Sequence, residues 1–286
     1  MTIQAILPDM QKIHLGQLTL WRQPSLTEST RCRVLIIHGL GEHSGRHSNT
    51  ISHLCKNGME VIRFDLRGAG ESGGKRQWVE HFEDYVEDVI DVYNWINRSL
   101  ESMPIFVLGH SLGGTIAIYF AAQYGKLLRG LILSAPAFYV GSSYSAAKIA
   151  IGKALVHIVP TLRMKTTSDL SMLSREKRVV DEYENDPLSC HFVTLRQGNE
   201  ILTALERVPQ KLKDIATALL IVHGSLDRSN TLEGSFEIIR KIPSLDKTLH
   251  ILPGGYHEPH NDLDKEHYFA ILTSWIEQRT ATEGKP

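Results

Sequence analysis

The chain has 286 residues, of which 42% are hydrophobic, and this is enough to bury the core of one α/β domain with an insertion. Its 31 basic and 32 acidic residues give a net charge of −1, so no electrostatic attraction to nucleic acid is expected. The cysteines, Cys32, Cys55 and Cys190, are an odd number without paired spacing, which argues against a disulfide framework and a zinc site and favours a reducing compartment.

The N-terminal residues show neither the basic start nor the long apolar run of a secretion signal, and no stretch reaches about 18 uninterrupted apolar residues. The sequence therefore predicts a cytoplasmic protein without a membrane-spanning helix.

The first predicted strand, Val34–Ile37, leads into the glycine-rich run His38–His47 (HGLGEHSGRH). A loop after an early strand is where a backbone N–H can bind an oxyanion, and Leu40 is the candidate donor in this run.

The second predicted strand, Val61–Phe64, is followed by the clearest helical period in the sequence. Apolar residues recur there at three- and four-residue steps, namely Phe82, Tyr85, Val86, Val89, Tyr93 and Ile96. This stripe predicts one helix face packed on a sheet, and not a cofactor site. The later predicted strands are Ile105–Leu108, Leu131–Ser134, Leu219–Val222 and Leu249–Leu252. Strands that alternate with helices predict an α/β fold with a largely parallel sheet covered on both faces.

The strand Ile105–Leu108 runs into Gly109–Gly113, which places Ser111 at the centre of a G-x-S-x-G elbow, and a helix is predicted over Leu112–Tyr124. Strand, tight turn and helix form the setting in which a serine nucleophile is held. Glycine flanks such a serine for steric reasons, because the chain folds closely back past a strained turn. The start of the helix favours developing negative charge, so Leu112 N–H is a candidate oxyanion donor. The alternative is a glycine-rich turn with an incidental serine.

Residues 136–208 form an interval too long for one crossover helix, and they are predicted to be a cap inserted over the active site. The chain is thus expected to divide into core residues 1–135, the cap, and core residues 209–286. Within the cap, Tyr144–Val159 is rich in alanine and aliphatic residues, and Pro160 should terminate a helix there. Its apolar side chains could line an acyl-chain tunnel, lie against a membrane surface, or only pack on other cap helices.

A serine nucleophile needs a histidine to take its proton and an acid to hold that histidine, and on this kind of elbow the acid precedes the histidine in the chain. Asp227 stands just past the strand Leu219–Val222, and His257 lies on the loop after Leu249–Leu252. Catalytic groups gather at the carboxyl ends of parallel strands, so Ser111, Asp227 and His257 are predicted to meet. The alternatives are a loop-capping carboxylate for Asp227 and an ordinary histidine, one of 14, for His257.

Two groups of histidines contain enough residues to be considered as candidate metal sites. They are His38, His43, His47 and His53 near one loop, and the pair His257 and His260. The first group lacks helical i, i+4 spacing, and the pair lacks a third ligand. Neither predicts a metal site, and hydrolysis by a serine nucleophile needs neither a metal nor another cofactor.

Several segments together carry a resemblance to a known family, namely His38–Arg46, Asp65–Ser72, Gly109–Gly113, His223–Asp227 and Gly255–His257. They closely resemble the monoacylglycerol lipase and lysophospholipase branch of the α/β-hydrolases, and the match covers nearly the whole chain. The run His38–Arg46 is the most specific part, since G-x-S-x-G is shared across the superfamily.

The resemblance implies an α/β-hydrolase fold with Ser111, Asp227 and His257 as the catalytic triad. It also implies that the backbone N–H groups of Leu40 and Leu112 form the oxyanion hole.

The resemblance further implies that Glu42, Arg46 and His260 lie near the alcohol end of the substrate, where the family holds a glycerol head group. The alternatives are a surface ion pair between Glu42 and Arg46, and a His260 that is only a neighbour of His257. The chain departs from the family at His47, where a tyrosine is often found.

The implied activity is hydrolysis of monoacylglycerols to fatty acid and glycerol through an acyl-enzyme, with a small lipid ester as substrate. Contact of the cap with membranes or lipid droplets is compatible with such a substrate. Alternatives with the same triad are a lysophospholipase, a general carboxylesterase and an acyltransferase that uses an alcohol in place of water. A ligand receptor that kept a hydrolase fold belongs to a different class, because fold does not fix function. The oligomeric state and the acyl-chain preference stay open.

Overall fold

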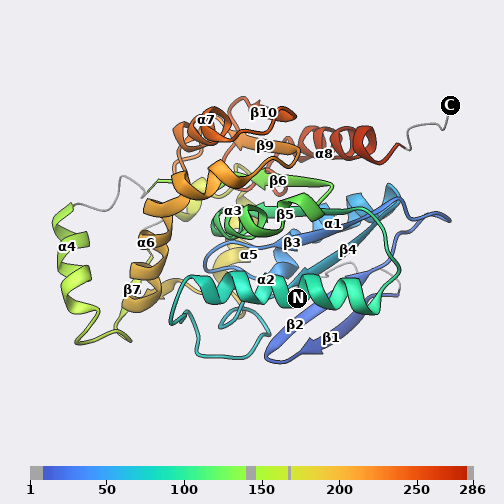
Figure 1. Cartoon of the computed structure of the whole chain (residues 1–286). Helices are drawn as coiled ribbons and strands as arrows, with labels where there is room; N and C mark the ends of the chain where they lie inside the picture. The colour runs from blue at the N-terminus through green and yellow to red at the C-terminus, as the bar shows by residue number, and fades with distance from the viewer. Residues whose placement is uncertain (1–8, 140–145, 167–168, 282–286) are drawn as a thin grey trace.

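The computed structural model describes residues 9–139, 146–166 and 169–281, in which an eight-stranded sheet runs through the centre of the molecule (Figure 1). The strand order is β1-β2-β4-β3-β5-β6-β9-β10. The pairs β1/β2 and β2/β4 are antiparallel, and the remaining pairs of this sheet are parallel. The strands span Gln11–Leu15 (β1), Leu18–Gln23 (β2), Cys32–Ile37 (β3), Met59–Phe64 (β4), Ile105–His110 (β5), Gly130–Ser134 (β6), Leu219–Gly224 (β9) and Lys247–Leu252 (β10).

Helices cover both faces of the sheet, and the alternation of side chains along the strands decides which core each residue joins. In β3, Leu35 and Ile37 join the core under α2, α3 and α7, whereas Val34 and Ile36 join the core under α1 and α8. Both cores consist of buried apolar side chains, so the sheet is a rigid support for the loops at its carboxyl edge. These helices span Ser48–Lys56 (α1), Glu83–Ser99 (α2), Leu112–Tyr124 (α3), Leu232–Lys241 (α7) and Lys265–Thr280 (α8).

The strands predicted from apolar runs are all present, and the prediction of a largely parallel sheet is confirmed. The helix predicted over Leu112–Tyr124 is α3 with the same bounds, and the apolar stripe of α2 packs into the core as expected. The sequence did not predict β1 and β2. β1 is an edge strand whose side chains are mostly exposed, so it carries no apolar run to mark it.

Between β6 and β9 the chain leaves the sheet and forms a separate group of elements, of which α4 and α6 are seen at the left of Figure 1. The group comprises α4 (Ala146–Leu155), β7 (Arg163–Lys165), α5 (Lys177–Asn185), β8 (Phe192–Thr194) and α6 (Leu195–Lys211). β7 and β8 pair as a small antiparallel sheet. We refer to this group as the cap.

The helix expected over Tyr144–Val159 ends earlier than predicted. It is α4, which starts at Ala146 and ends at Leu155, and residues 144 and 145 lie outside the described residues. The amide of Ile158 donates to the carbonyl of Leu155, so a tighter turn replaces the last helical turn before Pro160. At the other end, α6 continues to Lys211 and so runs through the expected cap boundary at residue 208.

Cys32, Cys55 and Cys190 are free and buried. Burial raises the pKa of the Cys32 and Cys55 thiols to about 12, so both are unreactive at neutral pH. Across residues 9–139, 146–166 and 169–281, we find no helix with both the length and the apolar character needed to cross a membrane.

Candidate active site

Ser111 is held on a strained turn between β5 and α3. Its backbone has φ 53° and ψ −119°, a conformation that side-chain-bearing residues rarely adopt. The neighbouring chain is close on both sides: a Cβ atom at Gly109 would lie 2.3 Å from the carbonyl oxygen of Gly113, and one at Gly113 would lie 2.2 Å from that of Ile37. The two glycines therefore permit the turn that projects the serine from the edge of the sheet.

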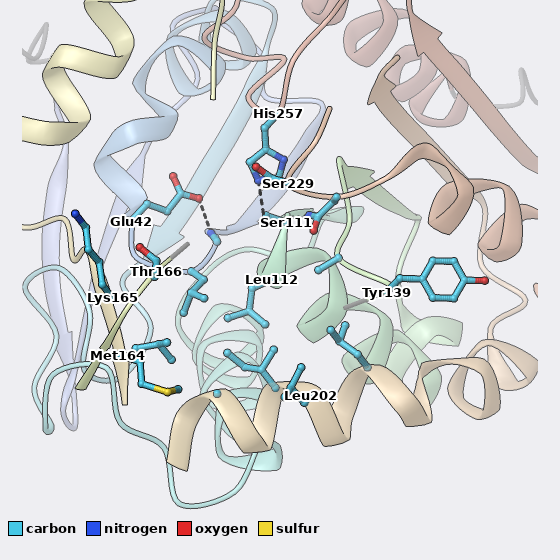
Figure 2. A pocket seen from close by; sticks show the side chains of 18 of the residues that line it. Glu42, Ser111, Leu112, Tyr139, Met164, Lys165, Thr166, Leu202, Ser229 and His257 are labelled. Carbon is cyan, nitrogen blue, oxygen red and sulfur yellow. Dashed lines mark hydrogen bonds between the residues drawn. The ribbon is translucent and has the colours of Figure 1, made fainter. Parts of the chain in front are cut away.

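The structure brings Ser111, His257 and Asp227 together in one hydrogen-bonded line. His257 Nε2 is 3.1 Å from Ser111 Oγ (Figure 2), and His257 Nδ1 donates to Asp227 Oδ2 at 2.8 Å. The Asp227 side chain is wholly buried, and its Oδ1 accepts the amide of Ser229 at 2.8 Å. A further histidine, His223 at the end of β9, shares its Nε2–H between the carbonyl of Asn230 at 2.8 Å and Asp227 Oδ2 at 3.2 Å. The carboxylate is thus fixed from several sides, which fixes the imidazole in turn.

The electrostatics of the triad favour an ion pair between Asp227 and His257. Burial disfavours the carboxylate of Asp227, but His257 and His223 outweigh it and hold the pKa of Asp227 below its ordinary value. Burial also disfavours the charged form of His257, yet the Asp227 carboxylate outweighs that effect and raises the pKa of His257. An imidazolium formed at His257 during a reaction is therefore stabilised in place.

The loop after β3 lies beside the nucleophile, and the cap holds this loop. Leu40 and Leu112 both line the cavity that contains Ser111, and Leu112 begins α3, so the helix itself does not use its N–H. The carbonyl of Gly41 accepts the amide of Cys190 at 2.7 Å and the hydroxyl of Tyr183 at 3.2 Å, and both donors belong to the cap. Of the residues expected to form an oxyanion hole, Leu112 is thus held at the start of α3, and Leu40 lies on a loop that the cap holds.

Three further contacts tie the cap to the active site. His43 Nε2 lies 2.9 Å from the carboxylate of Asp186. On the other side, the amides of His257 and Glu258 donate to the carbonyls of Met172 and Leu173, at 3.2 and 2.8 Å. The cap therefore bonds to both loops that flank Ser111.

A cavity of about 620 Å³ opens at Ser111 between the sheet edge and the cap (Figure 2). Its wall away from the triad is largely aliphatic and comes from the cap. The lining residues there include Ile149, Ile151, Leu155, Leu162, Met164, Leu170, Met172, Val193, Leu195, Ile201, Leu202 and Leu205. A long hydrocarbon chain fits such a volume and such a lining.

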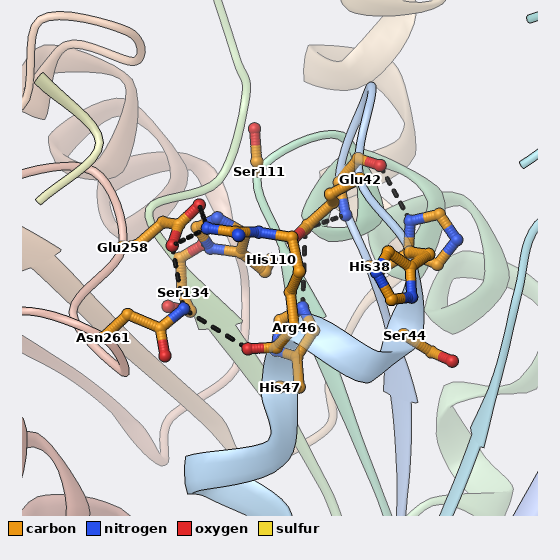
Figure 3. A network of polar contacts seen from close by, with 12 residues as sticks. His38, Glu42, Ser44, Arg46, His47, His110, Ser111, Ser134, Glu258 and Asn261 are labelled. Atoms are coloured by element: carbon orange, nitrogen blue, oxygen red, sulfur yellow. Dashed lines mark hydrogen bonds and ion pairs between the residues drawn. The ribbon is translucent and has the colours of Figure 1, made fainter. Parts of the chain in front are cut away.

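A buried ionic cluster lies at the triad end of the cavity, and Figure 3 shows its members. The Arg46 guanidinium contacts two carboxylates: it donates to both Glu258 oxygens at 2.9 and 2.7 Å, and its Nε lies 3.7 Å from Glu42. Glu42 also accepts the amide of Gly39 at 2.5 Å. Burial disfavours the ionised Glu42, but nearby histidines, His47 first among them, hold its pKa well below the ordinary value. Glu42 and Glu258 both line the cavity, so two carboxylates face its polar end.

The structure places His260 behind this cluster and not at the cavity wall. It is fully buried, and its ring stacks on that of His47 with centroids 4.4 Å apart. Burial lowers the pKa of His260 well below its ordinary value, which keeps the ring neutral at pH 7. His47, where the family often carries tyrosine, fills the space between His260 and Glu42, with its Nε2 3.4 Å from Glu42.

Sequence reasoning missed three residues that contact or line the site. Glu258 follows His257 directly, Tyr183 comes from the cap, and Asn230 lies three residues after Asp227. Their position next to a triad residue was the only signal for Glu258 and Asn230. Nothing local marked Tyr183, because its approach to Gly41 depends on how the cap folds.

Within the described part of the chain, no group of three or more His, Cys, Asp or Glu side chains could hold a metal ion.

The chain matches the family described as serine aminopeptidase, S33, over residues 28–264. It is 33% identical to the monoglyceride lipase of Homo sapiens over 273 residues, which are 94% of this chain and 90% of that protein. It is 31% identical to the monoacylglycerol lipase of Mycolicibacterium smegmatis over 245 residues, 85% of this chain and 87% of that protein.

Solved structures resemble it over nearly the whole chain. The monoacylglycerol lipase of Paleococcus ferrophilus superposes with a TM-score of 0.84 at 28% identity, covering 92% of this chain and 99% of that one. A soluble variant of the Saccharomyces cerevisiae monoglyceride lipase, in complex with a substrate analog, gives a TM-score of 0.84 at 25% identity and covers 99% of both chains. The predicted α/β-hydrolase fold is confirmed by these likenesses.

Proposed function

Because this chain belongs to the serine aminopeptidase S33 family of α/β-hydrolases, together with the monoglyceride lipases, we propose that it hydrolyses monoacylglycerols to fatty acid and glycerol. It is a carboxylic ester hydrolase, and its substrate is a lipid ester. One observation carries the proposal. The hydrogen-bonded serine, histidine and aspartate lie at a cavity that has an aliphatic wall on one side and two carboxylates on the other.

In the proposed first half-reaction, Ser111 Oγ attacks the ester carbonyl while His257 Nε2 takes its proton. The N–H groups of Leu40 and Leu112 bind the oxyanion, and each such donor contributes about 3 kcal/mol of barrier lowering in comparable sites. His257 then gives its proton to the leaving glycerol oxygen, and the acyl group stays on Ser111. Asp227 stabilises the imidazolium throughout.

In the second half-reaction, water attacks the acyl carbon and His257 Nε2 takes its proton. The bond from the acyl carbon to Ser111 Oγ breaks, Oγ receives the proton, and the fatty acid is released. The aliphatic wall of the cavity holds the acyl chain in both steps.

The charges at the polar end of the cavity favour binding of a neutral alcohol head group over binding of a phosphate head group. Glu42 and Glu258 share one arginine, Arg46, so these three side chains together carry a net charge of −1. A lysophospholipid phosphate would meet two carboxylates there, whereas glycerol hydroxyls can donate hydrogen bonds to them. In this proposal His260 supports the cluster through His47 and does not touch the head group.

We expect kcat/KM for a chain-length series of monoacylglycerols to exceed that for matched lysophospholipids and short aryl esters. The measurement is fatty acid release with each substrate under identical conditions. A preference for lysophospholipids or short esters would move the assignment to those classes, and transfer of the acyl group to added alcohols in place of water would mark an acyltransferase. Absence of turnover with tight ligand binding would indicate a receptor.

The cap, expected over residues 136–208, is also proposed to contact lipid surfaces peripherally. Its outer side exposes Ile151, Ile158 and Leu162, which are 60, 75 and 48% exposed. Ile151 and Leu162 also line the cavity, so this apolar surface is continuous with the space for the acyl chain. A fatty substrate could then pass from a lipid phase to Ser111 without crossing water.

Replacing Ile158 by aspartate should weaken binding to phosphatidylcholine vesicles about tenfold, because a charge replaces an apolar side chain that would enter the interface. Co-sedimentation with vesicles measures this. The matched control is Leu245→Asp, a fully exposed leucine on the loop before β10, which should not change binding. Equal binding of all three proteins would exclude this surface as the site of contact.

A further inference from the structure

The amide side chain of Asn230 lies against the nucleophile, at 3.2 Å from its Nδ2 to Ser111 Oγ. We propose that Asn230 is a fourth catalytic residue, which donates a hydrogen bond to Ser111 Oγ and promotes the release of the acyl group from the serine. The inference rests on the proposed serine hydrolase function, but it does not depend on which ester is the substrate.

The orientation of the Asn230 amide is fixed by its second contact. Nδ2 also lies 2.8 Å from the carbonyl oxygen of Ala135, which can only accept a hydrogen bond. The nitrogen, and not the oxygen, must therefore face Ala135, and the same NH₂ group meets Ser111. Both N–H bonds of the amide are thus used, one on each acceptor.

The backbone of Asn230 is also anchored, and its anchors are parts of the triad line. Its amide donates to Asp227 Oδ1 at 3.0 Å, and its carbonyl accepts from His223 Nε2 at 2.8 Å. His223 is set in turn by Ser235, whose hydroxyl is 2.7 Å from Nδ1. The side chain of Asn230 is therefore presented to Ser111 by the same loop that presents the carboxylate of Asp227 to His257.

This contact decides how the Ser111 hydroxyl points. Since Asn230 offers only a donor, Ser111 Oγ must accept from it, and the hydroxyl hydrogen is left for His257 Nε2 at 3.1 Å. The resting serine is thus already arranged to lose its proton to His257, with one oxygen lone pair occupied by Asn230.

The hydrogen bond from Asn230 to Ser111 Oγ has a different strength at different stages of the reaction. In the acyl-enzyme, Oγ is an ester oxygen and accepts the Asn230 hydrogen bond poorly. When water adds to the acyl carbon and the bond from that carbon to Oγ breaks, negative charge returns to Oγ before His257 delivers the proton taken from water. A donor aimed at Oγ stabilises this departing oxygen, so Asn230 favours deacylation over acylation and keeps the acyl-enzyme from accumulating.

The test separates the two steps with a p-nitrophenyl ester of butyric acid in stopped flow. Where the acyl-enzyme accumulates, the rapid release of nitrophenolate reports acylation of Ser111 and the steady rate that follows reports deacylation. Where no rapid phase appears, the steady rate reports acylation. In Asn230→Leu, which keeps the size of the side chain and removes its N–H groups, we expect deacylation to slow about tenfold, which equals about 1.4 kcal/mol, while acylation changes much less. Intact-protein mass spectrometry should then detect the butyryl adduct during turnover.

The variant Asn230→Ala also lacks the N–H donors and adds no charge beside Ser111, so it should accumulate the acyl-enzyme as well, and it serves if the leucine variant does not fold. Asn97→Leu, an exposed asparagine on α2 away from the cavity, is the control for the substitution itself. The inference is overturned if acylation and deacylation fall by the same factor, or if neither changes in either variant. Failure of the proposed function looks different: the wild-type protein would then release no nitrophenolate in a reaction that depends on Ser111, or would release it and yet leave monoacylglycerols intact.

Discussion

Replacing Ser111 by alanine is expected to lower ester hydrolysis about a million-fold. The residual rate would come from substrate binding and the oxyanion donors alone, because the group that forms the acyl-enzyme is gone. His257 and Asp227 keep their mutual hydrogen bond in this variant, so the thermal midpoint should change little. Fatty acid release from a monoacylglycerol and thermal unfolding of the same preparation measure the two effects.

Ser99→Ala is the matched control, since Ser99 is an exposed serine at the end of α2. It should retain the wild-type rate. Substantial hydrolysis by Ser111→Ala would mean that another group attacks the ester, and the assignment of the nucleophile would then be wrong. Loss of activity in both variants would point to damage that is unrelated to the hydroxyl.

The second large effect is expected from Asp227→Asn, which should lower kcat/KM about 10⁴-fold. An asparagine amide holds His257 in the wrong tautomer and no longer balances the imidazolium. The variant should also shift the pH profile. In the wild type, the Asp227 carboxylate raises the pKa of His257, and His257 must be neutral to take a proton. The acid limb of kcat/KM should therefore have its midpoint above about 6.5, and removal of the charge should move it to lower pH.

Rates measured from pH 5 to pH 9 test both parts of this prediction. Asp246→Asn removes a carboxylate from an exposed ion pair with Arg279, far from the cavity, and should leave both the rate and the midpoint unchanged. A wild-type midpoint well below 6.5, or a midpoint in Asp227→Asn that moves to higher pH, would contradict the electrostatic role given to Asp227.

The strands and the elbow could be predicted from the sequence because their physical causes are local. A buried parallel strand such as Val34–Ile37 needs a continuous apolar run, and the turn at Ser111 needs glycine on both sides. The order of Ser111, Asp227 and His257 along the chain, each after its own strand, made their meeting at one sheet edge predictable as well.

The remaining contacts could not be predicted, because they depend on tertiary packing. Glu258 carries no motif, and it becomes part of the site only because the loop after β10 brings it to Arg46. His260 has the spacing of a site residue, but a stack on His47 turns it away from the cavity. Asn230 reaches Ser111 because the carbonyl of Ala135 orients its amide, and the backbone of Ala135 has a φ of 45° that nothing in the sequence announces.

The bonds between the cap and the loops beside Ser111 bear on how such proteins can diverge. Gly41 is joined to Tyr183, and His43 to Asp186, across 142 and 143 positions of sequence. A cap that only covered a cavity could be exchanged between related proteins, and the substrate preference would then change with it. Here the segment from Tyr183 to Cys190 and the loop that carries Leu40 are joined by several hydrogen bonds, so the two must change together in evolution, and a grafted cap would bring its own catalytic geometry with it.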